Sequence, residues 1–188
     1  MVEYTPPYAE YEFLFNEVFD VYDSISGIDH EEFDADFVRM IMEGWGDYCT
    51  EVLLPLNEIG DREGLTFEAG EVTMPAGFVD AWKEGVEAGW YAAICKPEHG
   101  GMGLPHVFRN AMDEFAISTN MALSVVPALG LGVYDLVTGH GTNELIDHYS
   151  ANLATGLWCG TMCLTEPHAG TDLGIIRTKA TPQEDGTY

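Results

Sequence analysis

The sequence is poor in positive charge. Lys and Arg number 7 against 32 Asp and Glu in 188 residues, which gives a formal net charge of −25. Residues 1–100 carry 23 of the acids and 4 of the bases, so the excess lies towards the N-terminus. Such a field repels phosphate backbones, and we expect no binding to nucleic acid. Three interpretations of the acidity stay open: a surface that maintains solubility, adaptation to high salt, and a face that docks a basic partner.

Long apolar runs and clustered cysteines are also missing. No run of about 18 or more uncharged apolar residues occurs, so we expect no membrane span. The N-terminal residues 1–4 are acidic and aromatic, unlike the basic start of a secretory signal. These absences predict a soluble, cytoplasmic protein. Four irregularly spaced cysteines do not make a disulfide framework, and we expect buried, reduced thiols at all four: Cys49, Cys95, Cys159 and Cys163.

Metal-binding and catalytic motifs are absent as well. The six histidines do not fall at metal-ligand spacing, and the sequence has no HExxH, GxSxG or GxGxxG. We therefore expect no metal site and assign no catalytic residue. The glycine-rich residues 96–105 lack the order of a phosphate-binding loop and predict only a turn cluster.

What the sequence does contain is a series of apolar stripes at helical spacing. The first covers residues 11–22 and ends at Ser26-Gly27. Asp29, with an acid three residues on, resembles a capping box that opens a second helix, which we expect to end at Pro55. Residues 60–70 predict a loop, and Pro75 suits the start of a third helix. Three more helices are expected at 106–122, at 126–138, and at 143–154 with Asn143 as its cap.

After Gly156 the pattern changes from helix to strand. Residues 157–164 predict a strand from their β-branched and aromatic content, and residues 175–180 predict a second. Asp185-Gly186 is a hairpin turn signal whose returning strand is missing. The fold class is therefore expected to be mainly α, with helices followed by the first strands of a β domain. A truncated chain would show this pattern.

Residues 162–172 read MCLTEPHAGTD and resemble the acyl-CoA dehydrogenase signature, in which a strand runs into L-T-E-P-x-A-G-S/T-D. The loop 100–105 is similar to the family's G-G-x-G-L-P. Residues 141–156 are similar to its G-T-x-E-Q-K-x-x-Y-L-P-x-L-x-x-G helix, with departures at Leu145 and Ile146. Residues 4–60 resemble the N-terminal segment of the methylmercaptopropionyl-CoA dehydrogenase-like branch.

The resemblance implies a fold and an activity. It divides the chain into a helical extension (1–60), a helical N-terminal domain (61–156) and the start of a β-barrel-like middle domain (157–188). The implied reaction is FAD-dependent dehydrogenation of an acyl-CoA to a trans-2-enoyl-CoA by a homo-oligomer that reduces electron-transferring flavoprotein. The family's base, a glutamate, comes from a C-terminal helical domain outside this chain, so the chain alone is expected to be inactive.

The resemblance also implies site residues. Strand-end N–H groups left unpaired by Pro167 would meet the flavin ring, and the small pair Ala169-Gly170 would allow close approach. Glu166 is expected to fix the local backbone. The implied flavin contacts are Met162, Cys163, Leu164, Thr165, Gly170 and Thr171. The implied substrate contacts are Thr171, on the CoA side, and Val125 and Leu129, which with Ser124 and Pro127 would floor an acyl tunnel in the apolar, deeply buried stretch 123–132.

Two alternatives share these features. An acyl-CoA oxidase or flavin monooxygenase would carry the same signature but use oxygen. A non-catalytic, acidic helical interaction module would merely retain the motif.

Overall fold

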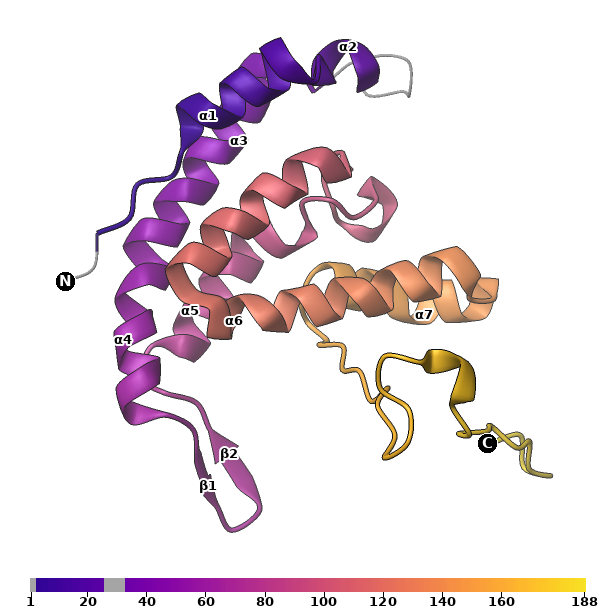
Figure 1. Ribbon diagram of the computed structural model, residues 1–188. Coiled ribbons are helices and arrows are strands. Elements are labelled where there is room, and N and C mark those ends of the chain that lie inside the picture. The colour runs from indigo at the N-terminus through magenta and orange to yellow at the C-terminus, as the bar shows by residue number, and fades with distance from the viewer. Residues whose placement is uncertain (1–2, 26–32) are drawn as a thin grey trace.

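The structure, a computed structural model, describes residues 3–25 and 33–188 (Figure 1). It is mainly helical, as expected. The α-helices are α1 (Tyr8–Phe13), α2 (Val21–Ile25), α3 (Ala35–Tyr48), α4 (Leu54–Glu63), α5 (Phe78–Glu87), α6 (His106–His140) and α7 (Asn143–Ala154). Two π-helical turns, η1 (Leu14–Val18) and η2 (Cys49–Leu53), and three 3₁₀ turns, η3 (Trp90–Ala92), η4 (Pro97–His99) and η5 (Leu173–Ile175), complete the helical part. Strands β1 (Thr66–Glu68) and β2 (Glu71–Thr73) form a hairpin.

Helix α6 runs through the molecule and changes direction at Asn120 (Figure 1). Asn120 has a non-helical backbone (φ −155°, ψ 87°) and is fully buried. Its side-chain oxygen accepts the N–H of Leu123 at 3.0 Å, as an N-cap does, and its amide donates to the carbonyl of Leu53 at 3.2 Å. The two helices expected at 106–122 and 126–138 are thus the two halves of one kinked helix.

By length and composition alone, α6 could cross a membrane. The central helix of a soluble protein passes the same test, and here the Asn120 contact ties α6 to the helical body. The expected absence of a span stays a prediction.

The main core forms where the first half of α6 meets α3 and the N-terminal segment. Phe108 and Phe115 of α6 are fully buried. The ring of Phe15 packs edge-on against Phe108 at 5.1 Å, and Trp45 of α3 donates its indole N–H to the carbonyl of Met112 at 2.7 Å. Aromatic residues of the first stripe therefore fasten the chain's beginning onto α6.

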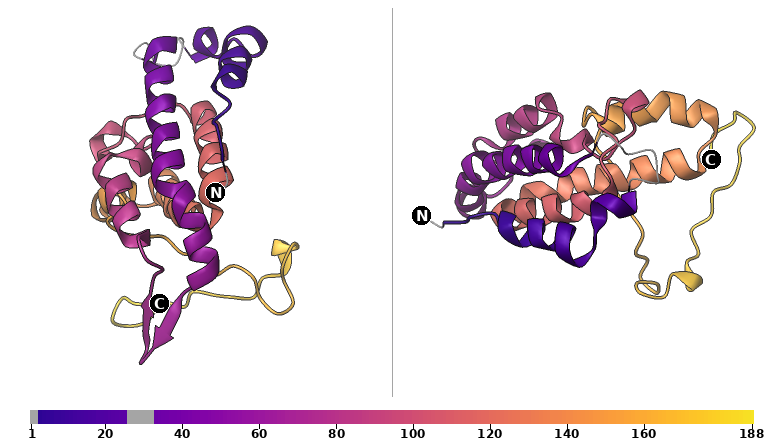
Figure 2. Two further views of the ribbon diagram at one scale, coloured as in Figure 1. Left: turned by 90° about the vertical axis from the view of Figure 1, so that its left-hand side faces the viewer. Right: turned by 90° about the horizontal axis from the view of Figure 1, so that it is seen from above.

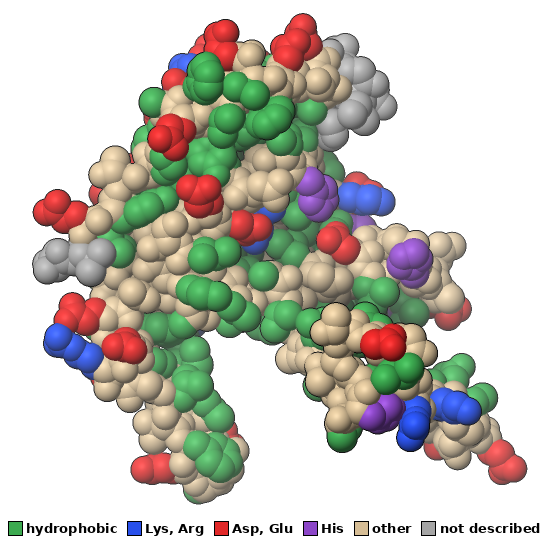
Figure 3. Space-filling model, in the orientation of Figure 1, with side chains coloured by type: hydrophobic (Ala, Val, Ile, Leu, Met, Phe, Trp, Pro, Cys, Tyr) green, Lys and Arg blue, Asp and Glu red, His purple; other side chains and the backbone are tan. Residues whose placement is uncertain are grey.

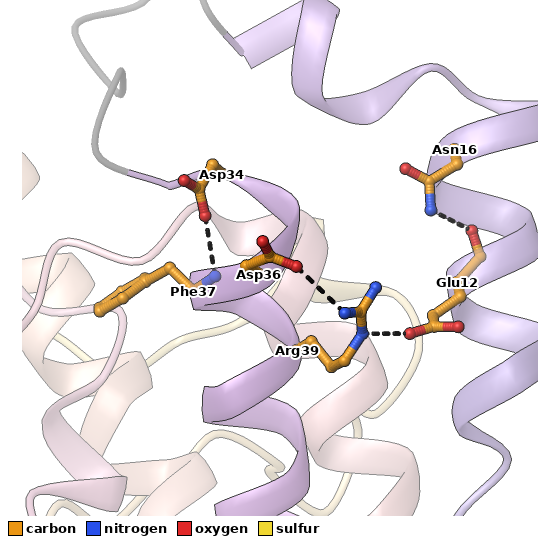
Figure 4. Close-up of polar contacts among 6 residues, drawn as sticks. All are labelled: Glu12, Asn16, Asp34, Asp36, Phe37 and Arg39. Atoms are coloured by element: carbon orange, nitrogen blue, oxygen red, sulfur yellow. Dashed lines mark hydrogen bonds and ion pairs between the residues drawn. The ribbon is translucent and has the colours of Figure 1, made fainter.

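An ion pair also links the N-terminal segment to α3 (Figure 4). Arg39 of α3 reaches Glu12 at 2.5 Å and Asp36 at 3.1 Å. Asp34 caps α3 by accepting the N–H of Phe37 at 2.8 Å. The capping box expected at Asp29 and the break at Ser26-Gly27 lie outside the described residues. Within them, the first stripe already breaks at Asp20, whose φ is 47°.

Several local expectations were wrong. The second helix does not end at Pro55, because Pro55 lies in the first turn of α4, where its missing N–H costs nothing, and η2 connects α3 to α4. Thr142, rather than Asn143, caps α7 and accepts the N–H of Leu145. Residues 60–70 are not simply a loop, since α4 continues to Glu63 and β1 begins at Thr66.

The hairpin projects from the end of α4 (Figures 1 and 2). Ala69 and Gly70 both have positive φ, 51° and 88°, as a type I′ turn requires. Phe67 pairs with Val72. Because side chains alternate along a strand, these two share a face with Leu65 and Met74, and all four are exposed.

The strands expected at 157–164 and 175–180 are not formed. Residues 157–188 run below α6 and α7 as an extended segment (Figure 1), and within the described residues their only β pairing is an isolated bridge between Glu166 and Ala169. A strand needs a neighbour to satisfy its N–H and C=O groups, and no neighbouring strand is available here. The turn at Asp185-Gly186 is present, with Gln183 donating to the carbonyl of Thr187 at 2.8 Å.

The expectation of four buried thiols was half wrong. Cys49 and Cys95 are fully buried, and burial raises the pKa of each thiol to about 12. Cys159 and Cys163 lie in the extended segment and are exposed.

Candidate functional site

The segment that carries the signature leaves α7 and crosses the second half of α6 at Gly160. The chain turns at Gly156 (φ 75°), and Trp158 donates its N–H to the carbonyl of Asn152 at 3.0 Å. A methyl group added at Gly160 would lie 2.7 Å from the carbonyl oxygen of Leu129 and 2.6 Å from a methyl of Val133. Only glycine permits this close crossing, which sets the position of the residues that follow.

The expected flavin contacts all lie on the surface. Met162 is 67% exposed and Leu164 41%; Cys163, Thr165, Gly170 and Thr171 are also exposed. Among residues 3–25 and 33–188, no group accepts a hydrogen bond from the backbone N–H groups of residues 162–165 or from the hydroxyls of Thr165 and Thr171. The segment therefore offers a row of unused donors to a ligand that carries acceptors.

A tight turn follows this row. Glu166 donates its N–H to the carbonyl of Ala169 at 2.9 Å, and Ala169 returns a bond of 3.1 Å. The Glu166 carboxylate accepts the hydroxyl and the N–H of Thr178, the latter at 2.8 Å, and the N–H of Arg177 at 3.0 Å. These bonds, with the Thr178 hydroxyl first, hold the pKa of that carboxyl below its usual range. The expectation that Glu166 fixes the local backbone is confirmed.

The expected substrate residues are not brought together. Val125 is 45% exposed, and the stretch 123–132 is thus buried on one side only. Ser124 and Pro127 face the core beside Trp45, and the backbone carbonyl of Leu129 lies against Gly160.

Val125 opens onto a cavity of about 700 Å³. Opposite it are α4, the base of the hairpin and the start of α5. The space-filling view shows apolar side chains around the hollow between the hairpin and the C-terminal segment (Figure 3). The cavity's apolar lining includes Leu65, Met74, Pro75, Phe78, Met121, Ala122 and Val125.

A second cavity, of about 220 Å³, adjoins the first between α5 and α6 and shares Met74 and Phe78 with it. Its wall is entirely apolar apart from the thiol of Cys159, and its other residues are Val79, Trp82, Leu123 and Val126. The sequence predicted a third helix from Pro75 but gave no sign of this cavity, because helical spacing does not show which apolar side chains stay partly exposed.

Comparison with known proteins identifies relatives of this sequence. No family model matches the chain. It is 41% identical over 159 residues to 3-methylmercaptopropionyl-CoA dehydrogenase of Ruegeria pomeroyi, and 34% identical over 131 residues to the broad-specificity linear acyl-CoA dehydrogenase FadE5 of Mycobacterium tuberculosis. A probable acyl-CoA dehydrogenase of Bacillus subtilis is 30% identical over 151 residues. The chain is related to the acyl-CoA dehydrogenases.

The likeness to acyl-CoA dehydrogenases covers most of the chain but little of each relative. The three matches span 85%, 69% and 80% of this chain, and 27%, 21% and 24% of the respective relatives. The chain thus spans about a quarter of their length. The resemblance stated from the signature motifs, including that to the methylmercaptopropionyl-CoA branch, is confirmed.

Outside the signature, the acyl-CoA dehydrogenase-like loop 100–105 has a packing role. Gly103 donates its N–H to the carbonyl of Cys95 at 2.8 Å, and a methyl group at Gly101 would overlap that same carbonyl. Tyr134 of α6 lies 2.9 Å from the ring of His99 and accepts the N–H of Lys96 at 3.0 Å. The loop is therefore the turn cluster that the sequence predicted, docked onto α6.

No metal site accompanies these features in the described ranges 3–25 and 33–188, where no three His, Cys, Asp or Glu side chains converge.

Proposed function

We propose that the protein containing this chain is an FAD-dependent acyl-CoA dehydrogenase that converts an acyl-CoA to its trans-2-enoyl-CoA. The observation that carries the proposal is the set of unused donors at residues 162–165 and Thr171, in a chain 41% identical to 3-methylmercaptopropionyl-CoA dehydrogenase. The relatives' names favour a dehydrogenase over an oxidase on the same scaffold.

The donor row suits a flavin. An isoalloxazine ring presents carbonyl oxygens and ring nitrogens along one edge, and backbone N–H groups at residues 162–165 can donate to them. The hydroxyl of Thr165 adds a donor beside the ring, and that of Thr171 can reach a pyrophosphate or pantetheine oxygen. When bound, the flavin supplies the hydride acceptor that the reaction needs.

The apolar cavities suit the acyl part of the substrate. Ligand pockets are concave and mostly apolar, with a few polar groups at the reacting end. The cavity beside Val125 and its neighbour between α5 and α6 have this character, and Cys159, three residues before Met162 in the sequence, lines the second cavity. We place the acyl chain in this region and the CoA towards Thr171.

The remaining parts of the proposal concern the whole protein. We propose electron-transferring flavoprotein as the electron acceptor, a homo-oligomeric assembly and a cytoplasmic location. The general base is assigned to no residue of this chain, because the acid in the signature, Glu166, is engaged with backbone N–H groups.

The test is made on the complete protein. It should purify with bound flavin, and adding an acyl-CoA without oxygen should bleach the flavin absorbance and release an enoyl-CoA. A protein that binds no flavin would contradict the proposal and favour the interaction module. Turnover that consumes oxygen and needs no other acceptor would instead establish the oxidase alternative.

A further inference from the structure

Glu166 is the most heavily engaged acid in residues 157–188. Its side chain is 14% exposed, in a segment whose residues are mostly exposed. One carboxylate oxygen accepts both donors of Thr178, and the other accepts the N–H of Arg177. The ring of His168 also lies 3.2 Å from this second oxygen and 3.1 Å from the carbonyl of Ile175. One side chain thus ties a turn to a segment eleven residues further on.

The turn lies between the donors of residues 162–165 and the hydroxyl of Thr171. Thr165 precedes Glu166 directly, and Gly170 and Thr171 follow Ala169, which is 2% exposed. The bonds between Glu166 and Ala169 close the turn. The hydrogen bonds from Arg177 and Thr178 to the Glu166 carboxylate, which we call the clamp, then fix the direction in which the chain enters and leaves the turn. The spacing between the Thr165 and Thr171 hydroxyls depends on this arrangement.

The chemistry requires a carboxylate. All three groups that it meets at residues 177 and 178 are donors, and a carboxylate accepts on both oxygens. A glutamine has the same shape but offers one acceptor and one NH₂ group. Whichever way its amide is turned, the NH₂ faces an N–H, and one donor loses its partner.

We propose that Glu166 is a positioning residue for the flavin. It touches neither flavin nor substrate and acts by holding Thr165 and Thr171 at the separation that the cofactor needs. The inference rests on the proposed function.

The test compares Glu166→Gln with Glu184→Gln in the complete protein. Glu184 is an exposed glutamate of the same segment, with no hydrogen bond or ion pair in the described structure. The readouts are the dissociation constant of FAD, the absorption spectrum and reduction potential of the bound flavin, and the melting temperature of the apoprotein. Loss of a hydrogen bond to a charged group predicts roughly tenfold to hundredfold weaker FAD binding and a shifted spectrum in Glu166→Gln. Glu184→Gln should match wild type.

A second pair of variants covers the case in which Glu166→Gln fails to fold. Thr178→Val removes only the hydroxyl donor of the clamp, and Thr178→Ser restores it. Thr178→Val should weaken FAD binding, and Thr178→Ser should rescue it. Unchanged FAD affinity and spectrum in Glu166→Gln, or an equal loss of stability with an unaltered flavin, would overturn the inference and leave the proposed function standing. A wild-type protein without flavin would overturn both.

Discussion

Two threonine hydroxyls stand on either side of the signature turn, and neither has a partner within the described residues. Thr165 lies at the end of the donor row and Thr171 just beyond Gly170. Replacing either with valine keeps the shape and removes one donor. At about 1 kcal/mol for a neutral hydrogen bond, each variant should weaken FAD binding roughly fivefold.

Titrating FAD into apoprotein measures this loss. Thr181→Val, an exposed change outside the turn, serves as the control. Wild-type affinity and spectrum in both Thr165→Val and Thr171→Val would show that the flavin lies elsewhere.

At the residue scale, the sequence identified the residues that belong to a motif, but it could not predict which side chains are buried. The signature located Glu166 and both threonines, because their order along the chain is enough. It could not place the Cys159 and Cys163 thiols, since exposure depends on whether a neighbour covers them. Nor could it show that the backbone carbonyl of Leu129 lies against Gly160, because helical spacing does not say which segment packs on a helix.

At the scale of elements, the crossing of residues 157–164 over α6 depends on Gly160. Gly160→Ala puts a methyl group 2.7 Å from the Leu129 carbonyl, and we expect it to reduce the free energy of unfolding by about 1–3 kcal/mol. Gly132 lies in α6 itself, and a methyl group there meets nothing within 4 Å. Gly132→Ala should therefore raise the free energy of unfolding by up to about 1 kcal/mol. Urea denaturation measures both. Equal stability of the two variants would mean that the segment does not rest on α6.

The cavity beside Val125 makes a prediction about substrate length. Val125→Phe adds bulk to a wall of the 700 Å³ cavity, and the preferred acyl chain should become shorter because less apolar volume remains. Rates with a series of acyl-CoA lengths measure the shift. Ile117→Phe, on the exposed side of the other half of α6, lines neither cavity and should leave the profile in place. An unmoved profile in Val125→Phe would make this residue an ordinary surface position.

The helices were the most predictable elements. Their stripes gave α3, α5 and α7 with small errors at the ends, because amphipathic spacing is a local property. The strands at 157–164 and 175–180 failed for the opposite reason, since a strand exists only where another one pairs with it. The β1–β2 hairpin was missed because its Ala69-Gly70 turn is not one of the strong Asn-Gly or Asp-Gly signals.

At the scale of the whole molecule, charge dominates. The described residues contain few ion pairs, and those of Arg39, Arg62 and Lys96 are largely exposed and worth little. Among the described residues, acids in ion pairs are thus a minority, and with 32 acids against 7 bases in the sequence, repulsion between acids outweighs attraction. Raising salt from about 0.01 M to about 1 M shortens the Debye length from roughly 30 Å to roughly 3 Å. The melting temperature should rise along a KCl series, more than for a protein of balanced charge.

That series discriminates among the interpretations of the acidity. A melting temperature that stays constant or falls as the KCl concentration rises would rule out adaptation to high salt. A rise would favour it and would leave the docking of a basic partner to a separate binding measurement.

The β1–β2 hairpin affects self-association. Each of its strands has one edge without a partner in the described structure, and such edges can recruit strands from other molecules. Two features oppose this. The strands are three residues long, and the face opposite Phe67 and Val72 carries Glu68 and Glu71 directly across from each other. A second hairpin that paired with this one in register would bring four carboxylates together. The repulsion between them disfavours aggregation through the exposed strand edges.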